Sequence, residues 1–81
     1  MPYYVYMLLC KDGSYYTGQA KNVEHRVEQH KKGQGARYTR MHKPAKIVYM
    51  EEFNSRSDAM KREREIKSFS HSKKQRLIDS R

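Results

Sequence analysis

The first apolar segment of the chain does most to limit the folds that are open to it. Residues 3–10 read YYVYMLLC and contain no charged side chain. A segment that is apolar at successive positions, not at alternate ones, is typical of a strand that is covered on both faces. It is far shorter than the ~20 residues that cross a membrane. No basic segment precedes it, as one would in a secretory signal. We therefore expect a central strand inside one small domain spanning residues 1–81.

The rest of the chain divides into short elements that are separated by turn residues. Asn22 can cap the first helix and Gly33 can end it. The predicted elements are strands at residues 3–10, 15–19 and 45–53, helices at 23–32 and from 54 or 55 to about 68, and a short amphipathic turn at 73–79. The glycines and cations of residues 33–44 indicate a mobile basic loop. This order, ββαβαα, predicts an α+β fold with a small three-stranded, antiparallel-containing sheet and flanking helices.

The charge of the chain favours a polyanionic partner. Lys and Arg number 18 against nine Asp and Glu, for a net charge of +9. Residues 21–44 hold seven basic and two acidic residues, and residues 66–81 hold five and one. Two basic blocks suit a nucleic acid, whereas a surface kept soluble by repulsion is the alternative explanation. The single cysteine, Cys10, excludes an internal disulfide and a cysteine metal cluster, so we expect a reducing, cytoplasmic compartment.

The first predicted helix carries polar side chains where apolar ones are expected. Val23 and Val27 define its inward stripe, and the helical period places Arg26 and His30 on that stripe or at its edge. Burial of an unpaired guanidinium is costly, so a buried Arg26 needs a partner or a ligand. His30 by itself fits two interpretations, a packing histidine whose hydrogen bonds are satisfied and a catalytic histidine.

The second predicted helix has a carboxylate in the same kind of position. Ala59, Met60 and Ile66 mark its inward face, and Glu63 lies between them. A buried carboxylate is normally paired or binds something. Glu63 therefore either forms a structural ion pair with Arg26 or a neighbouring lysine, or serves as a functional ligand.

Two tyrosine triplets in the predicted hairpin resemble a known family. Tyr4-Val5-Tyr6 is followed by Tyr16-Thr17-Gly18, and residues 19–26 lead to the helical Arg26. With a histidine and a second-helix glutamate in the same order, the chain resembles the GIY-YIG endonuclease superfamily over residues 3–79. It is most similar to the stand-alone, single-domain bacterial subgroup. Tyr4 stands where the first glycine of the family motif is found, and Thr17 replaces the middle isoleucine.

The resemblance implies metal-dependent hydrolysis of a phosphodiester bond in nucleic acid, with five catalytic residues. Glu63 is implied as the sole protein ligand of Mg²⁺ or Mn²⁺, which suits a cation that is often held by one or two carboxylates. Arg26 would hold the phosphate oxygens through its planar fork. In the family the second-motif tyrosine is the proposed general base, a role that falls on Tyr16 here. We expect His30 to activate or orient Tyr16, and Tyr6 to orient the water or the phosphate.

The hairpin offers a geometric test of this shared site. A two-residue loop at positions 12 and 13 would pair Leu9 with Tyr16 and send Tyr6 and Tyr16 to opposite faces. A three-residue loop, Asp12-Gly13-Ser14, with its usual glycine bulge would bring them to one face. The nuclease interpretation therefore predicts an odd-length or bulged hairpin.

The basic blocks are expected to contact the nucleic-acid backbone, which confers affinity but little sequence choice. The predicted contact residues are Lys31, Lys32, Arg37, Arg40, Lys43, Lys73, Lys74 and Arg76. We expect DNA as the substrate and no membrane partner. Two alternatives stay open, a nucleic-acid-binding module that keeps the fold without cleaving, and a structural basic protein of RNA assemblies.

Overall fold

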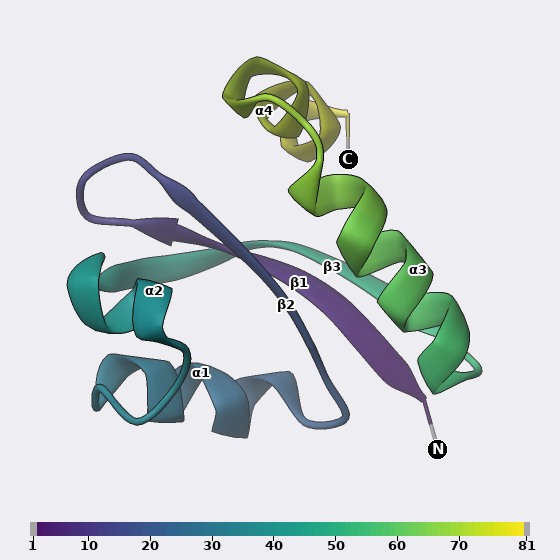
Figure 1. The fold of residues 1–81 in the computed structure, drawn as a ribbon, viewed down its shortest axis with the longest axis horizontal. Helices are drawn as coiled ribbons and strands as arrows, with labels where there is room; N and C mark the ends of the chain where they lie inside the picture. The colour runs from purple at the N-terminus through teal and green to yellow at the C-terminus, as the bar shows by residue number, and fades with distance from the viewer. Residues whose placement is uncertain (1, 81) are drawn as a thin grey trace.

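The computed structural model describes residues 2–80, which form three strands and four helices (Figure 1). In chain order the elements are β1 (Tyr3–Cys10), β2 (Tyr15–Ala20), α1 (Val23–Lys31), α2 (Arg37–Met41), β3 (Pro44–Phe53), α3 (Arg56–Lys67) and α4 (His71–Asp79). The predicted α+β fold with three strands and flanking helices is confirmed.

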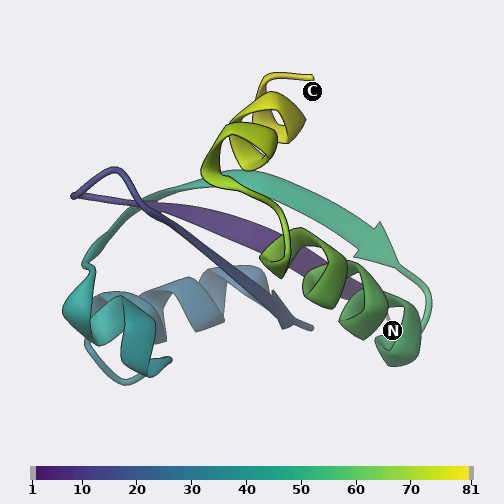
Figure 2. The same cartoon turned by 45° about the horizontal axis from the view of Figure 1, so that its top comes forward.

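The sheet is antiparallel, with β1 between β2 and β3. Val5, Tyr6, Met7 and Leu8 of this central strand are completely buried, as its apolar sequence predicted. Tyr6 and Leu8 pack against Val23 and Val27 of α1, whereas Val5 and Met7 pack against α3 on the opposite face. Figures 1 and 2 show the sheet between these helices. Consecutive residues of β1 therefore all enter a core because each face has its own helical layer.

The β1–β2 hairpin has the odd-length loop that the sequence predicted. Tyr6 pairs with Gly18 and Leu8 with Tyr16, so both tyrosines lie on one face of the sheet. The three-residue loop is positions 11–13, one residue earlier than expected, and is closed by a 2.8 Å hydrogen bond from Cys10 N to Ser14 O. Its last residue, Gly13, has φ +87°, the left-handed conformation that a glycine bulge requires.

Three expectations about the helices are corrected. Residues 33–44 contain the short helix α2 in place of a continuous loop. The C-terminal element is a nine-residue helix capped by Ser70, not a short turn that begins near residue 73. Met60, expected on the inward face of α3, is 38% exposed because Ala59 and Ile66 occupy that face. The predicted cap at Asn22 is confirmed, and of the two residues that were expected to begin the second helix, Ser55 is its cap.

Thr17 of β2 is a buried residue whose hydroxyl has no hydrogen-bond partner within residues 2–80. Burial of an unsatisfied hydroxyl costs free energy that an apolar residue of the same shape avoids. We expect Thr17→Val to raise the free energy of unfolding by about 1 kcal/mol, measured by urea denaturation. Thr39→Val is the contrasting variant, because the Thr39 hydroxyl is bonded to His30 and Ala36, and it should lower that free energy. A destabilised Thr17→Val protein would contradict this account.

Candidate active site

The five side chains implied as catalytic come from four separate elements. Tyr6 belongs to β1, Tyr16 to β2, Arg26 and His30 to α1, and Glu63 to α3. Because β2 is an edge strand in contact with both α1 and α3, groups from both helices can approach the tyrosines there. The charges of Arg26 and Glu63 each affect the pKa of both phenols. Tyr6, Tyr16 and His30 contact one another through their rings, and Arg26 and Glu63 lie near enough for their charges to act on both phenols, so we treat the five as one cluster.

His30 is the buried centre of this cluster, with 1% of its surface exposed. Its Nε2 lies 2.8 Å from the Tyr6 hydroxyl oxygen. Its ring packs against the Tyr16 ring at a centroid distance of 4.9 Å, and no hydrogen bond joins these two residues in the described chain. His30 therefore forms its hydrogen bond with Tyr6 and contacts Tyr16, the partner expected from the sequence, through its ring. Tyr6 lies on the central strand, and its side chain packs on the face of the sheet that α1 covers. His30 of α1 is buried at the same face.

Burial dominates the acid–base properties of the three aromatic groups. It raises the pKa of the Tyr6 phenol, with help from Tyr16 and against the charge of Arg26. It also raises the pKa of Tyr16, against the opposing charges of Lys67 and Arg26. Burial, and then repulsion from Arg26, lower the pKa of His30. At neutral pH both phenols therefore keep their protons and the imidazole is neutral.

Gly18 allows the two tyrosine rings to approach β2. A Cβ atom at this position would lie 2.8 Å from Tyr6 Oη and 2.9 Å from Tyr16 Cε2, inside van der Waals contact. A side chain at Gly18 would therefore displace both phenols. The glycine of the second triplet has a steric role at this site, independent of any unusual backbone conformation.

Glu63 lies at the rim of the cluster with 18% of its side chain exposed. Its Oε2 forms an ion pair with Lys67 Nζ at 2.9 Å, one helical turn further along α3. A hollow of about 160 Å³ adjoins it, lined also by Met60 and Arg64. The ion pair with a neighbouring lysine that the sequence left open is therefore present, and the carboxylate still borders open space.

Arg26 is half-buried without an acidic partner among residues 2–80. Its Nη1 donates a hydrogen bond to Gln29 Oε1 at 3.0 Å, and no carboxylate lies within ion-pair distance of it in that range. The guanidinium also acts on the neighbouring Tyr6 phenol. It carries five N–H donors and no carboxylate partner within residues 2–80, so the fork keeps capacity to bind an anion.

Three polar residues that touch the cluster were missed from the sequence, namely Gln29, Lys67 and Thr39. Gln29 follows Arg26 by three positions and Lys67 follows Glu63 by four. Both are spacings at which side chains meet on a helix, so the signal was available. Thr39 contacts His30 from beyond the turn that ends α1, and no local pattern relates the two residues.

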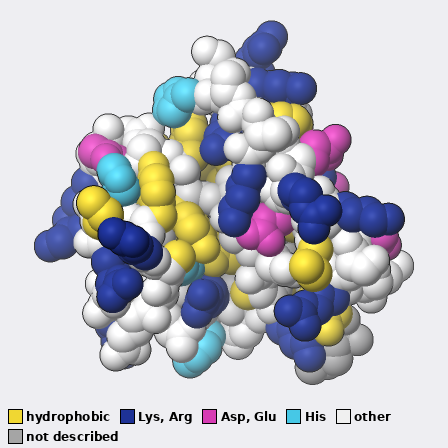
Figure 3. Space-filling view, viewed as in Figure 1, with side chains coloured by type: hydrophobic (Ala, Val, Ile, Leu, Met, Phe, Trp, Pro, Cys, Tyr) yellow, Lys and Arg dark blue, Asp and Glu magenta, His cyan; other side chains and the backbone are white. Residues whose placement is uncertain are grey.

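The predicted contact residues for nucleic acid lie mostly on the surface. Seven of the eight are exposed, and Lys74 is half-buried. None of the eight forms an ion pair with an acidic side chain in the described part of the chain. Figure 3 draws one face of the molecule. Lys and Arg side chains lie over α2 on one side of this face and over α3 and α4 on the other. Unpaired cations on both flanks are what contact with a phosphate backbone requires.

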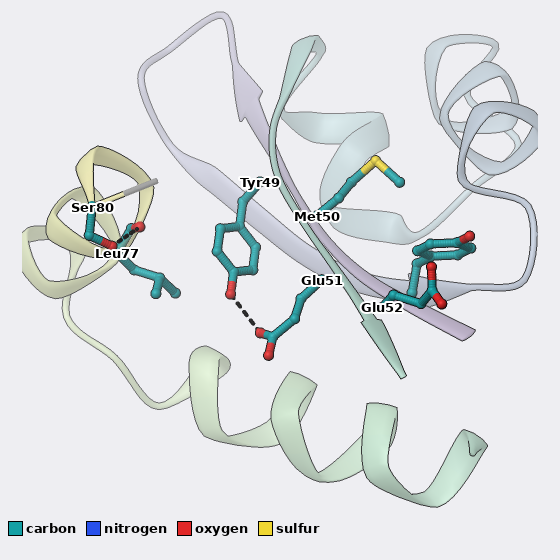
Figure 4. Close-up of a pocket in the computed structure, with 7 residues that line it drawn as sticks. Tyr49, Met50, Glu51, Glu52, Leu77 and Ser80 are labelled. Carbon is teal, nitrogen blue, oxygen red and sulfur yellow. Dashed lines mark hydrogen bonds between the residues drawn. The ribbon is translucent and has the colours of Figure 1, made fainter. Parts of the chain in front are cut away.

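A separate cavity of about 480 Å³ lies between β3, an outer strand of the sheet, and α4 (Figure 4). It is lined by Tyr49, Glu51 and Leu77 among others, and Tyr49 donates a 2.6 Å hydrogen bond to Glu51. Two of its lining residues are glutamates, and none belongs to the five-residue cluster. This cavity is therefore distinct from the candidate active site and poorly suited to a polyanion.

Nearly the whole chain matches a known protein family. The GIY-YIG catalytic domain family matches residues 2–76, so the chain belongs to this family, which is a family of nucleases. None of the helices within residues 2–80 is long and apolar enough to cross a membrane.

Similar relatives include small proteins of nearly the same length. A UPF0213 protein of Staphylococcus saprophyticus is 53% identical over 76 residues, which is 94% of this chain and 93% of the relative. A UPF0213 protein of Staphylococcus aureus is 51% identical over 79 residues, 98% of this chain and 96% of the relative.

Two solved structures share the fold. The solution structure of the UPF0213 protein BH0048 from Bacillus halodurans has a TM-score of 0.65 at 43% identity, covering 100% of this chain and 86% of that one. The protein EF2693 from E. faecalis has a TM-score of 0.68 at 34% identity, covering 99% and 85%.

Proposed function

We propose that this protein is a metal-dependent endonuclease that hydrolyses phosphodiester bonds in nucleic acid, with DNA as its substrate. The observation that carries the proposal is the arrangement of two half-buried opposite charges. Arg26 and Glu63 act on the same two phenols, yet each has a different partner, Gln29 and Lys67 respectively. A guanidinium and a carboxylate that act on the same phenols without pairing with each other can each take a ligand, an anion for the guanidinium and a cation for the carboxylate.

The chain's own residues divide the work as follows. Arg26 binds the phosphate oxygens, where negative charge increases in the transition state. Tyr16, which is only partly buried, faces the attacking water, whereas the fully buried Tyr6 bonds to His30 and does not reach solvent. As a base, Tyr16 needs its phenolate form, which Arg26 and Lys67 favour by their charge and burial opposes.

Glu63 fits the role of sole protein ligand for Mg²⁺ or Mn²⁺. Within residues 2–80 no three acidic, histidine or cysteine side chains lie together in a group that could hold a metal ion. Mg²⁺ retains several waters and is often held by one or two carboxylates and substrate phosphate, which matches a carboxylate beside an open hollow. When bound, the cation supplies stabilisation of phosphoryl charge and of the leaving oxygen.

Substrate affinity would come from the unpaired cations on both flanks of the site. Contacts of this kind read the backbone, which DNA and RNA share, so strandedness or structure selects the target more than base sequence does. The cytoplasm is the compartment that we propose, in keeping with the single, buried Cys10.

The proposal is tested with the wild-type protein on supercoiled plasmid, duplex DNA, single-stranded DNA and RNA, each with Mg²⁺, Mn²⁺ or EDTA. We expect nicking or cleavage of DNA that requires the cation and weakens as salt rises. The lysine on Glu63 favours a second candidate, a binding module that does not cleave, because an ammonium already neutralises the carboxylate. Salt-dependent binding without cleavage of any substrate under any cation would replace the first proposal by the second.

A further inference from the structure

Thr39 is joined to the buried histidine by a short chain of hydrogen bonds. Its Oγ1 lies 2.7 Å from His30 Nδ1, and the same hydroxyl donates to the Ala36 carbonyl oxygen at 2.8 Å. Thr39 and His30 are each only 1% exposed, so water does not compete for these bonds. The turn before α2 is held closely against the imidazole, since a Cβ atom on Gly35 would lie 2.1 Å from His30 Nδ1.

The directions of these bonds determine which imidazole nitrogen carries the proton. A threonine hydroxyl has one proton, and here it is donated to the Ala36 carbonyl. Toward His30 the Thr39 oxygen can then only accept, which places a proton on Nδ1. In a neutral imidazole the other nitrogen, Nε2, is left as an acceptor, and it lies 2.8 Å from Tyr6 Oη. Tyr6 therefore donates its hydroxyl proton to His30.

A single contact favours the opposite tautomer. The Ala36 N–H points at His30 Nδ1 from 3.3 Å, which would require a lone pair on that nitrogen. At this length it is the weaker of the two interactions at Nδ1. The Thr39 hydroxyl is thus the group that decides between the tautomers, and without it the Ala36 N–H would be the remaining polar partner.

The tautomer of His30 decides whether the Tyr6 hydroxyl acts as a donor or as an acceptor toward the rest of the site. When the Tyr6 hydroxyl donates its proton to His30, its oxygen can still accept a hydrogen bond from a donor elsewhere in the site. The neighbouring group there is Arg26, which affects the Tyr6 phenol and carries donors only. In the other tautomer the Tyr6 O–H would point toward the guanidinium, and two donors would face each other.

We propose that Thr39 is a positioning residue that holds His30 in the Nδ1–H tautomer, so that Tyr6 presents an acceptor to Arg26. The tautomer follows from the contacts of this fold, whereas its effect on cleavage rests on the proposed nuclease function. The two parts are therefore measured separately.

The first measurement is the tautomer itself, read from the ¹⁵N chemical shifts of the His30 ring in two-bond ¹H–¹⁵N spectra at neutral pH. We expect the Nδ1–H form in the wild type and in Thr39→Ser, which keeps the hydroxyl. Thr39→Val should shift His30 toward the Nε2–H form. Backbone amide spectra of both variants report whether the fold is intact. A wild-type ring in the Nε2–H form, or a Thr39→Val ring that stays Nδ1–H, would overturn the proposal.

The second measurement is cleavage by the same three proteins. We expect Thr39→Val to reduce kcat by about tenfold or more with little change in nucleic-acid affinity, and Thr39→Ser to restore it. Equal loss in both variants would show that Thr39 acts through packing and not through its hydroxyl. If the wild type binds without cleaving, the proposed function fails, while the ring spectra still decide the tautomer. Should Thr39→Val not fold, the wild-type and Thr39→Ser spectra decide the assignment.

Discussion

Replacement of Glu63 by glutamine is expected to reduce cation-dependent cleavage by at least about 10²-fold. The amide keeps the shape of the side chain and removes its charge, so a hard divalent cation would lose the carboxylate that we propose as its protein ligand. The same variant loses the ion pair with Lys67, which is more than half exposed. Such pairs contribute about 0–1 kcal/mol, so the fold should persist and the loss of activity can be assigned to the site.

Glu65→Gln is the matched control for this variant, since Glu65 lies on the same helix and bonds to Arg62, away from the cluster. It should cleave like the wild type. Titration with Mn²⁺ provides a readout that does not depend on turnover, because paramagnetic broadening should centre on Glu63 and disappear in Glu63→Gln. Undiminished cleavage by Glu63→Gln would remove the carboxylate from the mechanism.

Replacement of Arg26 by alanine is expected to reduce kcat by about 10²–10³-fold, the range seen when one preorganised donor to transition-state charge is removed. Lysine should restore only a small part of this activity, because it keeps the charge but lacks the planar fork that matches phosphate oxygens. Binding of nucleic acid should change far less than kcat, since the other exposed cations that we propose as backbone contacts remain.

Arg40→Ala is the variant that distinguishes an arginine that only binds the nucleic-acid backbone from one that acts at the reacting centre. Arg40 is an exposed residue of α2 and one of the predicted backbone contacts. Its loss should weaken binding and reduce the salt dependence of affinity by about one phosphate contact, with kcat at saturating substrate retained. If Arg26→Ala behaved in the same way as Arg40→Ala, Arg26 would be a binding residue and not part of the reacting centre.

Much of the fold was predictable because its signals are local. The uninterrupted apolar run of β1 required cover on both faces, and the loop with its glycine bulge placed Tyr6 and Tyr16 on one side. Asn22 was recognised as a helix cap by residue type alone, and Ser55 was one of the two caps considered for α3. In each of these cases the signal comes from residues that are close in the sequence or that follow the side-chain spacing of one strand or helix.

Other features depended on contacts that no local pattern contains. Residues 33–44 look like a flexible segment, yet they form α2 because Thr39 and Gly35 pack against the buried His30. His30 forms its hydrogen bond with the fully buried Tyr6, whereas its contact with Tyr16 is between the two rings. Met60 seemed apolar enough for the core but is exposed, since Ala59 and Ile66 fill the available face of α3.

The sequence by itself determined the class of fold, the family and the chemical identity of the cluster, because these follow from the order of residue types along the chain. Only the tertiary structure decided which groups are paired. It placed Lys67 on Glu63, left Arg26 without a carboxylate partner within residues 2–80, and connected Thr39, His30 and Tyr6 in one line of hydrogen bonds. Hydrogen bonds and ion pairs depend on distances of a few ångströms between elements, and those distances arise only when the two cores pack on either side of the sheet.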